Sequence, residues 1–157
     1  MKRFDGIDDF EAAIRIFREV EGGRRTPPRN GIRWDLCYAD DDPKETLWMV
    51  WPDFLDQSGD SRPEKEELPI DVQLPAKMFV LVDAMRSEYH RKKAAVGVRF
   101  YCHEGPKRVA EGVITKITHL FDERPKIRAQ PGATAQRPQL SRPVRAHVSR
   151  QPGSWLI

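Results

Sequence analysis

The sequence predicts a mainly β protein, a small antiparallel barrel of about six or seven strands followed by a basic tail that is disordered in isolation. Segments in which apolar and polar residues alternate recur along residues 1–122, and most connections between them are of hairpin length. The chain has 157 residues, 39% of them hydrophobic, which is enough for one small core. Residues 123–157 are rich in Pro and Arg and poor in large apolar side chains, so burial cannot offset their ordering entropy. We therefore expect a barrel domain, 1–122, and a tail, 123–157.

The first predicted strand lies within residues 8–18, where every second residue is apolar. Its buried face would consist of Phe10, Ala12, Ile14 and Ile16. A helix is the competing interpretation, because Asp8 or Asp9 can cap one and a helical stripe is also present. That stripe consists of Phe10, Ala13 and Phe17.

The second strand is the best defined of the chain. It follows a loop rich in Gly and Pro, 21–31, and its inner face would carry Ile32, Trp34, Leu36 and Tyr38. After an acidic turn, 39–45, residues 46–51 are apolar on both faces. Either this third strand is covered on its outer side, or Trp48 is exposed and available to a partner.

The middle of the chain is less regular. Residues 52–68 are polar and acidic, and we interpret them as a mobile insertion loop. Two short strands are expected at 70–75 and 78–85, the first of them ending at Pro75. The basic stretch 85–95 would form either a helical turn or a long polar hairpin loop before a strand that begins near Val96.

Residues 100–117 predict a hairpin, with a loop centred on Glu104, Gly105 and Pro106 and a second alternating strand behind it. This stretch resembles the last two strands of the C-terminal barrel domain of translation elongation factor Tu. The shared features are a basic residue, Glu, Gly, one further residue and a basic residue in the loop, and then a Val-x-x-Gly-Val run. Residues 10–38 resemble the first two strands of the same domain, with Phe-Glu-Ala opening a strand and Glu-Gly-Gly-Arg-x-Thr-Pro in the loop. The resemblance covers roughly residues 8–118, with a poorly matched middle.

The resemblance implies a small antiparallel barrel that binds rather than catalyses. In the elongation factor this domain helps to hold the backbone of aminoacyl-tRNA, and it packs against the GTPase domain and partner proteins. Arg33 matches a backbone-contacting Arg, and Glu104 with Gly105 matches the loop that approaches the RNA. The candidate RNA-binding residues are therefore Arg24, Arg25, Arg29, Arg33, Glu104, Gly105 and Lys107.

Two departures from the family pattern weigh against RNA. Asp35 stands where the family has an uncharged amide, and Pro106 removes a backbone donor from the loop. Residues 124–157 carry six Arg, one Lys and no acid, so that the rest of the chain has a net charge of −4 within the overall +3. The barrel is thus mildly acidic, and an Arg-rich tail attracts RNA and acidic proteins alike.

We therefore expect a protein-interaction module related to translation, or one that imitates the elongation-factor surface. Its partner would be a translational GTPase or a protein that targets one, such as a toxin, with Trp48 and Trp51 as candidate anchors. The alternative is a module that binds the backbone of tRNA or another RNA.

Several function classes are not expected. The sequence has no nucleotide-binding P-loop, no zinc-ligand spacing and no nucleophile-elbow pattern, so we predict no enzyme, no cofactor and no metal site. No apolar run reaches the roughly 18 to 20 residues that cross a membrane, and no signal segment is recognised, which predicts a cytoplasmic protein. Cys37 and Cys102 should be buried thiols, although their spacing alone does not exclude a disulfide.

Overall fold

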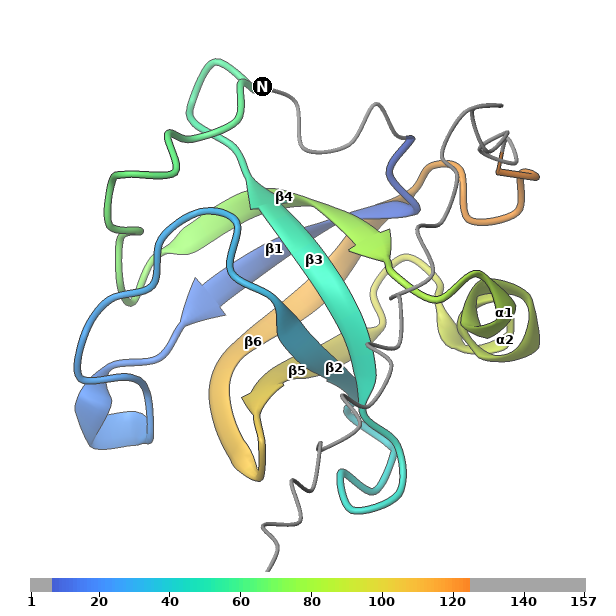
Figure 1. Cartoon of the computed structure of the whole chain (residues 1–157), viewed down its shortest axis with the longest axis horizontal. Helices are drawn as coiled ribbons and strands as arrows, with labels where there is room; N and C mark the ends of the chain where they lie inside the picture. Colours follow the sequence, from blue (N-terminus) through green and yellow to red (C-terminus); the bar gives the residue numbers. More distant parts are fainter. Residues whose placement is uncertain (1–6, 125–157) are drawn as a thin grey trace, which may run out of the picture. The chain divides into compact units, whose positions relative to one another are not determined.

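Six antiparallel strands close into a barrel in the computed structural model, which describes residues 7–124 (Figure 1). The strands are β1 (Phe10–Ile16), β2 (Trp34–Tyr38), β3 (Trp48–Phe54), β4 (Gln73–Val80), β5 (Arg99–Glu104) and β6 (Lys107–Ile117). Their order around the barrel is β1-β4-β3-β2-β5-β6, and β6 pairs with β1 to close the sheet. The predicted fold class is confirmed. The predicted disorder of the tail concerns residues 125–157, which lie outside the described residues.

Strand β1 confirms the strand interpretation of residues 8–18 and excludes the helix. The four apolar residues predicted to face inward are all buried, namely Phe10, Ala12, Ile14 and Ile16. Burying one such large apolar side chain contributes about 1.5–3 kcal/mol, so the alternation decides the conformation here.

Gly112 on β6 makes room for Phe100, its register partner on β5. A Cβ atom at position 112 would lie 2.3 Å from the Phe100 ring, closer than any side chain tolerates. Phe100 in turn meets Phe10 of β1 edge-on, with 6.4 Å between ring centroids. The glycine in the Val-x-x-Gly-Val run therefore has a packing role, since it lets rings from two strands share the barrel interior.

The two short strands expected at 70–75 and 78–85 are in fact one strand, β4, which runs through Pro75. The carbonyl of Pro75 accepts a hydrogen bond from the Leu55 amide, so its nitrogen also faces the β3 side. Strand β3 has already ended at Phe54 there, so the missing N–H breaks no ladder bond. The sequence prediction was wrong because it treated this proline as a strand end.

Strand β3 is longer than the predicted 46–51 and includes Pro52, where the insertion loop was expected to begin. Pro52 pairs with Met78 of β4, while the pairing of β3 with β2 ends at Val50. The proline is tolerated because no β2 residue is paired with it. The acidic loop therefore starts only after Phe54.

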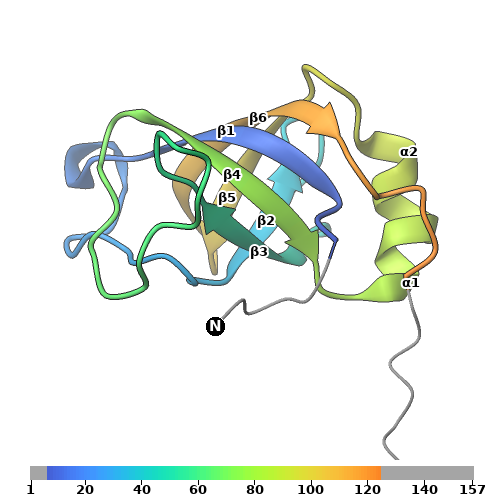
Figure 2. The same ribbon diagram turned by 90° about the horizontal axis from the view of Figure 1, so that it is seen from above.

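A helical segment, 83–93, covers one end of the barrel and resolves the alternatives left open for 85–95 in favour of a helix. It comprises α1 (Asp83–Met85), a π-helical turn (Arg86–His90) and α2 (Arg91–Lys93). Figure 2 shows this segment at one end of the barrel and the loops 17–33 and 55–72 at the other. The wider π-helical turn turns both Arg86 and His90 inward, where they are 4% and 0% exposed.

Buried charged side chains hold the helical segment against the barrel. The Asp9 carboxylate is fully buried and accepts hydrogen bonds from Arg86 Nε at 2.7 Å, Arg124 Nη2 at 2.6 Å and the Val80 amide at 2.7 Å. Arg86 Nη2 also donates to the His119 carbonyl at 2.7 Å. A buried carboxylate with these three donors is well compensated. Through Arg86 it also holds the segment that follows β6 in place.

Cys37 and Cys102 are buried free thiols, as predicted. Tyr101 pairs with Cys37 and Leu36 pairs with Cys102, so the two sulfurs belong to opposite faces of neighbouring strands and cannot bridge. Burial raises the pKa of the Cys102 thiol. No helix within residues 7–124 has the length and apolar character needed to span a membrane.

Candidate binding surface around the β5–β6 hairpin

The tip of the β5–β6 hairpin packs against the loop 17–33, which lies within the first of the two segments that carry the family resemblance. Oε1 of Glu104 accepts hydrogen bonds from Trp34 Nε1 and Arg24 Nη1, both at 3.0 Å. Lys107 Nζ donates to the Gly23 carbonyl at 2.9 Å. We call these residues, Gly23, Arg24, Trp34, Glu104 and Lys107, the clasp.

Glycines allow the loop to reach the hairpin. The loop leaves β1 through a short 3-10 helix, η1 (Glu19–Glu21), and Gly22 ends it in the left-handed region at φ 98°. A Cβ atom at Gly23 would lie 2.1 Å from the Phe17 carbonyl oxygen. At the tip of the hairpin, exposed Gly105 supplies the positive φ of 58° that the tight turn needs.

The clasp separates the candidate RNA-binding residues into two groups. Arg24, Glu104 and Lys107 form the side-chain contacts of the clasp within the molecule. Arg25, Arg29 and Arg33 lie exposed at the same end of the molecule. Arg25 Nε lies 3.4 Å from Glu19 Oε1 in an exposed ion pair that contributes little to stability.

Arg33 leads into a surface on the outer side of β2 and β3. Its guanidinium carbon lies 4.9 Å from the centroid of the Trp51 ring, within cation–π distance. Asp35 faces Met49 across the β2–β3 pair, and Met49 is 47% exposed. Side chains alternate along a strand, so Asp35 of β2 and residues 49, 51 and 53 of β3 share this outer side, and Arg33, just before β2, lies over Trp51 of that side. We call Arg33, Asp35, Met49, Trp51 and Asp53 the β2–β3 face.

Trp48, the other candidate anchor, lies near the opposite end of the barrel under the helical segment. Its ring is 4.7 Å from that of Tyr89, and its indole nitrogen is buried. Tyr89 donates a hydrogen bond to Asp41, which also pairs with Lys93 at 2.9 Å. The helical segment thus covers Trp48, which lies on the same side of β3 as buried Val50, whereas Met49 on the other side is 47% exposed.

Sequence reasoning missed a buried polar pair between β2 and the same helical segment. Tyr38 Oη and His90 Nδ1 lie 2.7 Å apart, and both side chains are fully buried. Burial raises the pKa of Tyr38 and lowers the pKa of His90 to about 4, so the imidazole is neutral at pH 7. The alternation in β2 did predict that Tyr38 faces inward, but no local pattern places His90 beside it.

Comparison with known proteins supplies no further guide to this surface. Neither a scan against protein-family models nor a search of curated proteins found a match for the chain. Within residues 7–124, no three His, Cys, Asp or Glu side chains lie close enough together to hold a metal ion.

Proposed function

We propose that this chain is a non-enzymatic, cytoplasmic binding module that recognises a protein through the β2–β3 face. The observation that carries the proposal is the stack of Arg33 on Trp51 beside exposed Met49. Arg, Trp and Met are enriched in protein interfaces, and Arg and Trp dominate the residues that contribute most to binding. The stack also holds the guanidinium in place, which lowers the entropy that a partner must remove.

The charges of this surface favour a protein over a nucleic acid. Asp35 shares the outer face with Arg33, and a carboxylate in that place repels phosphate. The clasp pairs Arg24 with Glu104 at 3.0 Å, which reduces the positive charge at this end of the barrel. A partner that presents an apolar side chain to Met49 and a carboxylate to Arg33 fits both features.

For the partner's identity we propose a translational GTPase or a protein that targets one. This part of the proposal rests on the resemblance of residues 10–38 and 100–117 to the C-terminal domain of elongation factor Tu. The clasp supports it in one respect, because the two resembling segments contact each other through Arg24 and Glu104.

Binding of tRNA or another RNA backbone is the second candidate. It is favoured by the exposure of Arg25, Arg29 and Arg33 at one end of the barrel. Its affinity would fall steeply with salt, because each phosphate contact releases counterions.

One experiment separates the two candidates. The tagged full chain is incubated with a cytosolic extract, with and without ribonuclease, and then with purified elongation factor Tu and purified tRNA at two salt concentrations. Met49→Ala should weaken protein binding by about tenfold or more and barely affect tRNA, because it removes apolar contact area without changing the charge beside Arg33. Arg33→Glu should weaken either kind of binding. Val72→Ala is the matched control, since Val72 is 45% exposed and lies outside the β2–β3 face.

A protein that is retained after ribonuclease treatment and lost in Met49→Ala supports the proposal. Retention of tRNA alone, removed by moderate salt and insensitive to Met49→Ala, overturns it in favour of the second candidate. Equal losses in Met49→Ala and Val72→Ala would also contradict the role of the β2–β3 face.

A further inference from the structure

The β2–β3 face carries one basic and one acidic side chain that are unpaired within the described part of the chain. Neither Arg33 nor Asp35 forms a salt bridge there. Arg33 rests on the Trp51 ring, and a guanidinium stacked in this way keeps N–H donors available at its edge. The second carboxylate of the face is already engaged, because Asp53 accepts a hydrogen bond from Ser61 Oγ at 2.6 Å.

The neighbouring strand does not balance the Asp35 carboxylate either. Asp35 faces His103 of β5, a side chain that is 2% exposed. Burial lowers the pKa of His103, so its imidazole is neutral at pH 7 and supplies no positive charge to Asp35. The face therefore has one positive and one negative group to offer to another molecule.

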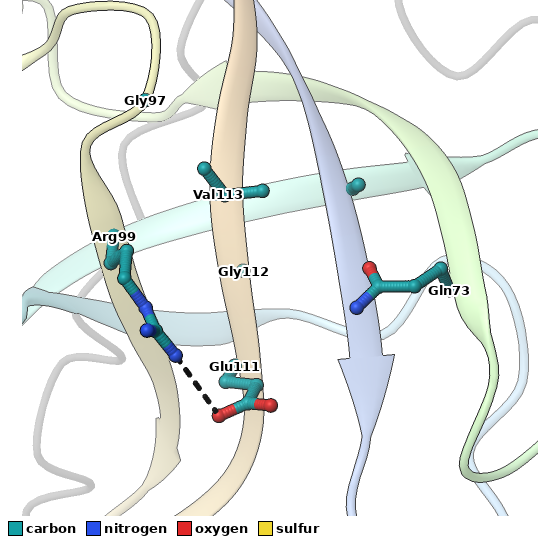
Figure 3. A pocket seen from close by; sticks show the side chains of 7 residues that line it. Gln73, Gly97, Arg99, Glu111, Gly112 and Val113 are labelled. Atoms are coloured by element: carbon teal, nitrogen blue, oxygen red, sulfur yellow. Dashed lines mark ion pairs between the residues drawn. The ribbon is translucent and has the colours of Figure 1, made fainter.

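The opposite wall of the barrel, over β1 and β6, is different because its charged residues are paired within the chain. Figure 3 shows Arg99 beside Glu111 there, with Nη2 of Arg99 3.9 Å from the carboxylate. Glu111 also accepts a hydrogen bond from Arg15 Nε at 3.0 Å. Arg15 is in turn shared with Glu21 and Asp71. This wall has no charge left to select a partner, whereas the β2–β3 face does.

Four outward side chains of the β2–β3 face form a two-by-two block. Asp35 of β2 is the register partner of Met49 of β3. Arg33, two residues before Asp35, lies over Trp51, two residues after Met49. Each position along the strands thus has a charged residue on the β2 side and an apolar one on the β3 side. The sign of the charge reverses from one position to the next.

We propose that two copies of this chain associate face to face through the β2–β3 face, about a two-fold axis that lies in the interface and crosses the strands. Such an axis sets Arg33 of each copy opposite Asp35 of the other, and Met49 opposite Trp51. Both contacts are favourable, because arginine pairs with a carboxylate and a methionine sulfur packs well at the edge of an aromatic ring. An axis along the strands would instead set Asp35 against Met49, which leaves the carboxylate covered and unpaired.

The association is weak and reversible. The outer wall of a barrel curves away from a flat contact, so the interface is small and its Kd should be about 0.1 mM. The ion pairs are near the surface, so salt weakens them. Because the second copy covers the surface assigned above to a partner protein, self-association competes with that partner. Only this competition rests on the proposed function.

Sedimentation velocity of the purified full chain, at concentrations up to about 1 mM, tests the association. Arg33→Asp and Asp35→Arg each place like charges at both contacts and should weaken the dimer about tenfold or more. An equimolar mixture of the two variants should associate about as well as the unchanged chain, because each variant supplies the charge that the other lacks. Recovery in the mixture also shows that both variants are folded.

Arg99→Asp is the matched control, since it changes the net charge as much as Arg33→Asp does, but on the opposite wall, and should leave association unchanged. A chain that is monomeric at about 1 mM, single variants that associate as well as the unchanged chain, or a mixture that stays monomeric would each overturn the inference.

Failure of this inference is distinguishable from failure of the proposed function, because the chain is measured without any partner. A monomeric chain that still loses a retained protein in Met49→Ala overturns the inference and leaves the proposed function standing. A dimer that obeys the charge exchange supports the inference even if no protein is retained from the extract.

Discussion

Replacing Glu104 tests whether the hairpin tip holds the fold together or contacts a ligand. Its carboxylate is the acceptor for both Trp34 Nε1 and Arg24 Nη1. Glu104→Gln keeps an oxygen for the indole and removes the charge opposite Arg24. Glu104→Ala removes both interactions, so the difference between the two variants isolates the hydrogen bond to Trp34.

The expected magnitudes follow from burial. The Arg24–Glu104 pair is 35% exposed on each side chain, and ion pairs of this kind contribute about 0–1 kcal/mol. Trp34 is 2% exposed, so an indole N–H without an acceptor costs about 1–3 kcal/mol. Water can enter the space that Glu104 leaves and accept a hydrogen bond from the indole. We therefore expect a cost in the lower part of this range, about 1–2 kcal/mol. Glu104→Ala should therefore destabilise the barrel by about 2 kcal/mol and Glu104→Gln by less than about 1 kcal/mol.

Urea unfolding followed by far-UV circular dichroism measures these differences without relying on Trp34 fluorescence. The stability of a domain of this size is about 5–15 kcal/mol, so both shifts are measurable. Arg24→Ala is the control and should match Glu104→Gln. If Glu104→Ala is as stable as Glu104→Gln, the clasp does not stabilise the fold through Trp34. If Glu104→Gln instead lowers tRNA affinity at unchanged stability, Glu104 is a ligand contact as the family resemblance implies.

Two further predictions concern the helical end. Arg86→Ala leaves the fully buried Asp9 carboxylate with Arg124 and one amide. It should lower the free energy of unfolding by about 3 kcal/mol, at the lower end of the range for broken buried pairs. The urea midpoint measures this loss, and a value below about 1 kcal/mol contradicts the role given to Asp9. The pKa of His90 is lowered to about 4 in the folded state, against about 6.5 when unfolded, so the stability it contributes is complete above pH 6.5 and is lost as the pH falls toward 4. Between pH 7 and pH 5 the loss should be about 2 kcal/mol, and His90→Gln should abolish that part of the pH dependence. An equally pH-dependent His90→Gln variant would show that another group is responsible.

Alternation along single strands predicted much of the barrel, because it reports which face of a strand is buried. It placed β1, β2 and the β5–β6 hairpin, but it left a helix open for residues 8–18, which only the structure excluded. It misplaced β4 and the end of β3 because a proline is harmful to a strand only where a neighbour needs its N–H. Whether that neighbour is present at Pro75 or Pro52 depends on where β3 and β2 end, which is not a local property.

The candidate surfaces divide in the same way. The sequence by itself determined the residue types available, including the arginines of loop 17–33, the acidic balance of the barrel and the turn at Gly105. Only the tertiary structure decided which of those arginines is engaged, since Arg24 and Glu104 are far apart in sequence and meet because β2 and β5 pair. The β2–β3 face likewise requires β2 and β3 to lie side by side. Contacts between distant segments depend on the closure of the barrel, and closure is set by the packing of all six strands together.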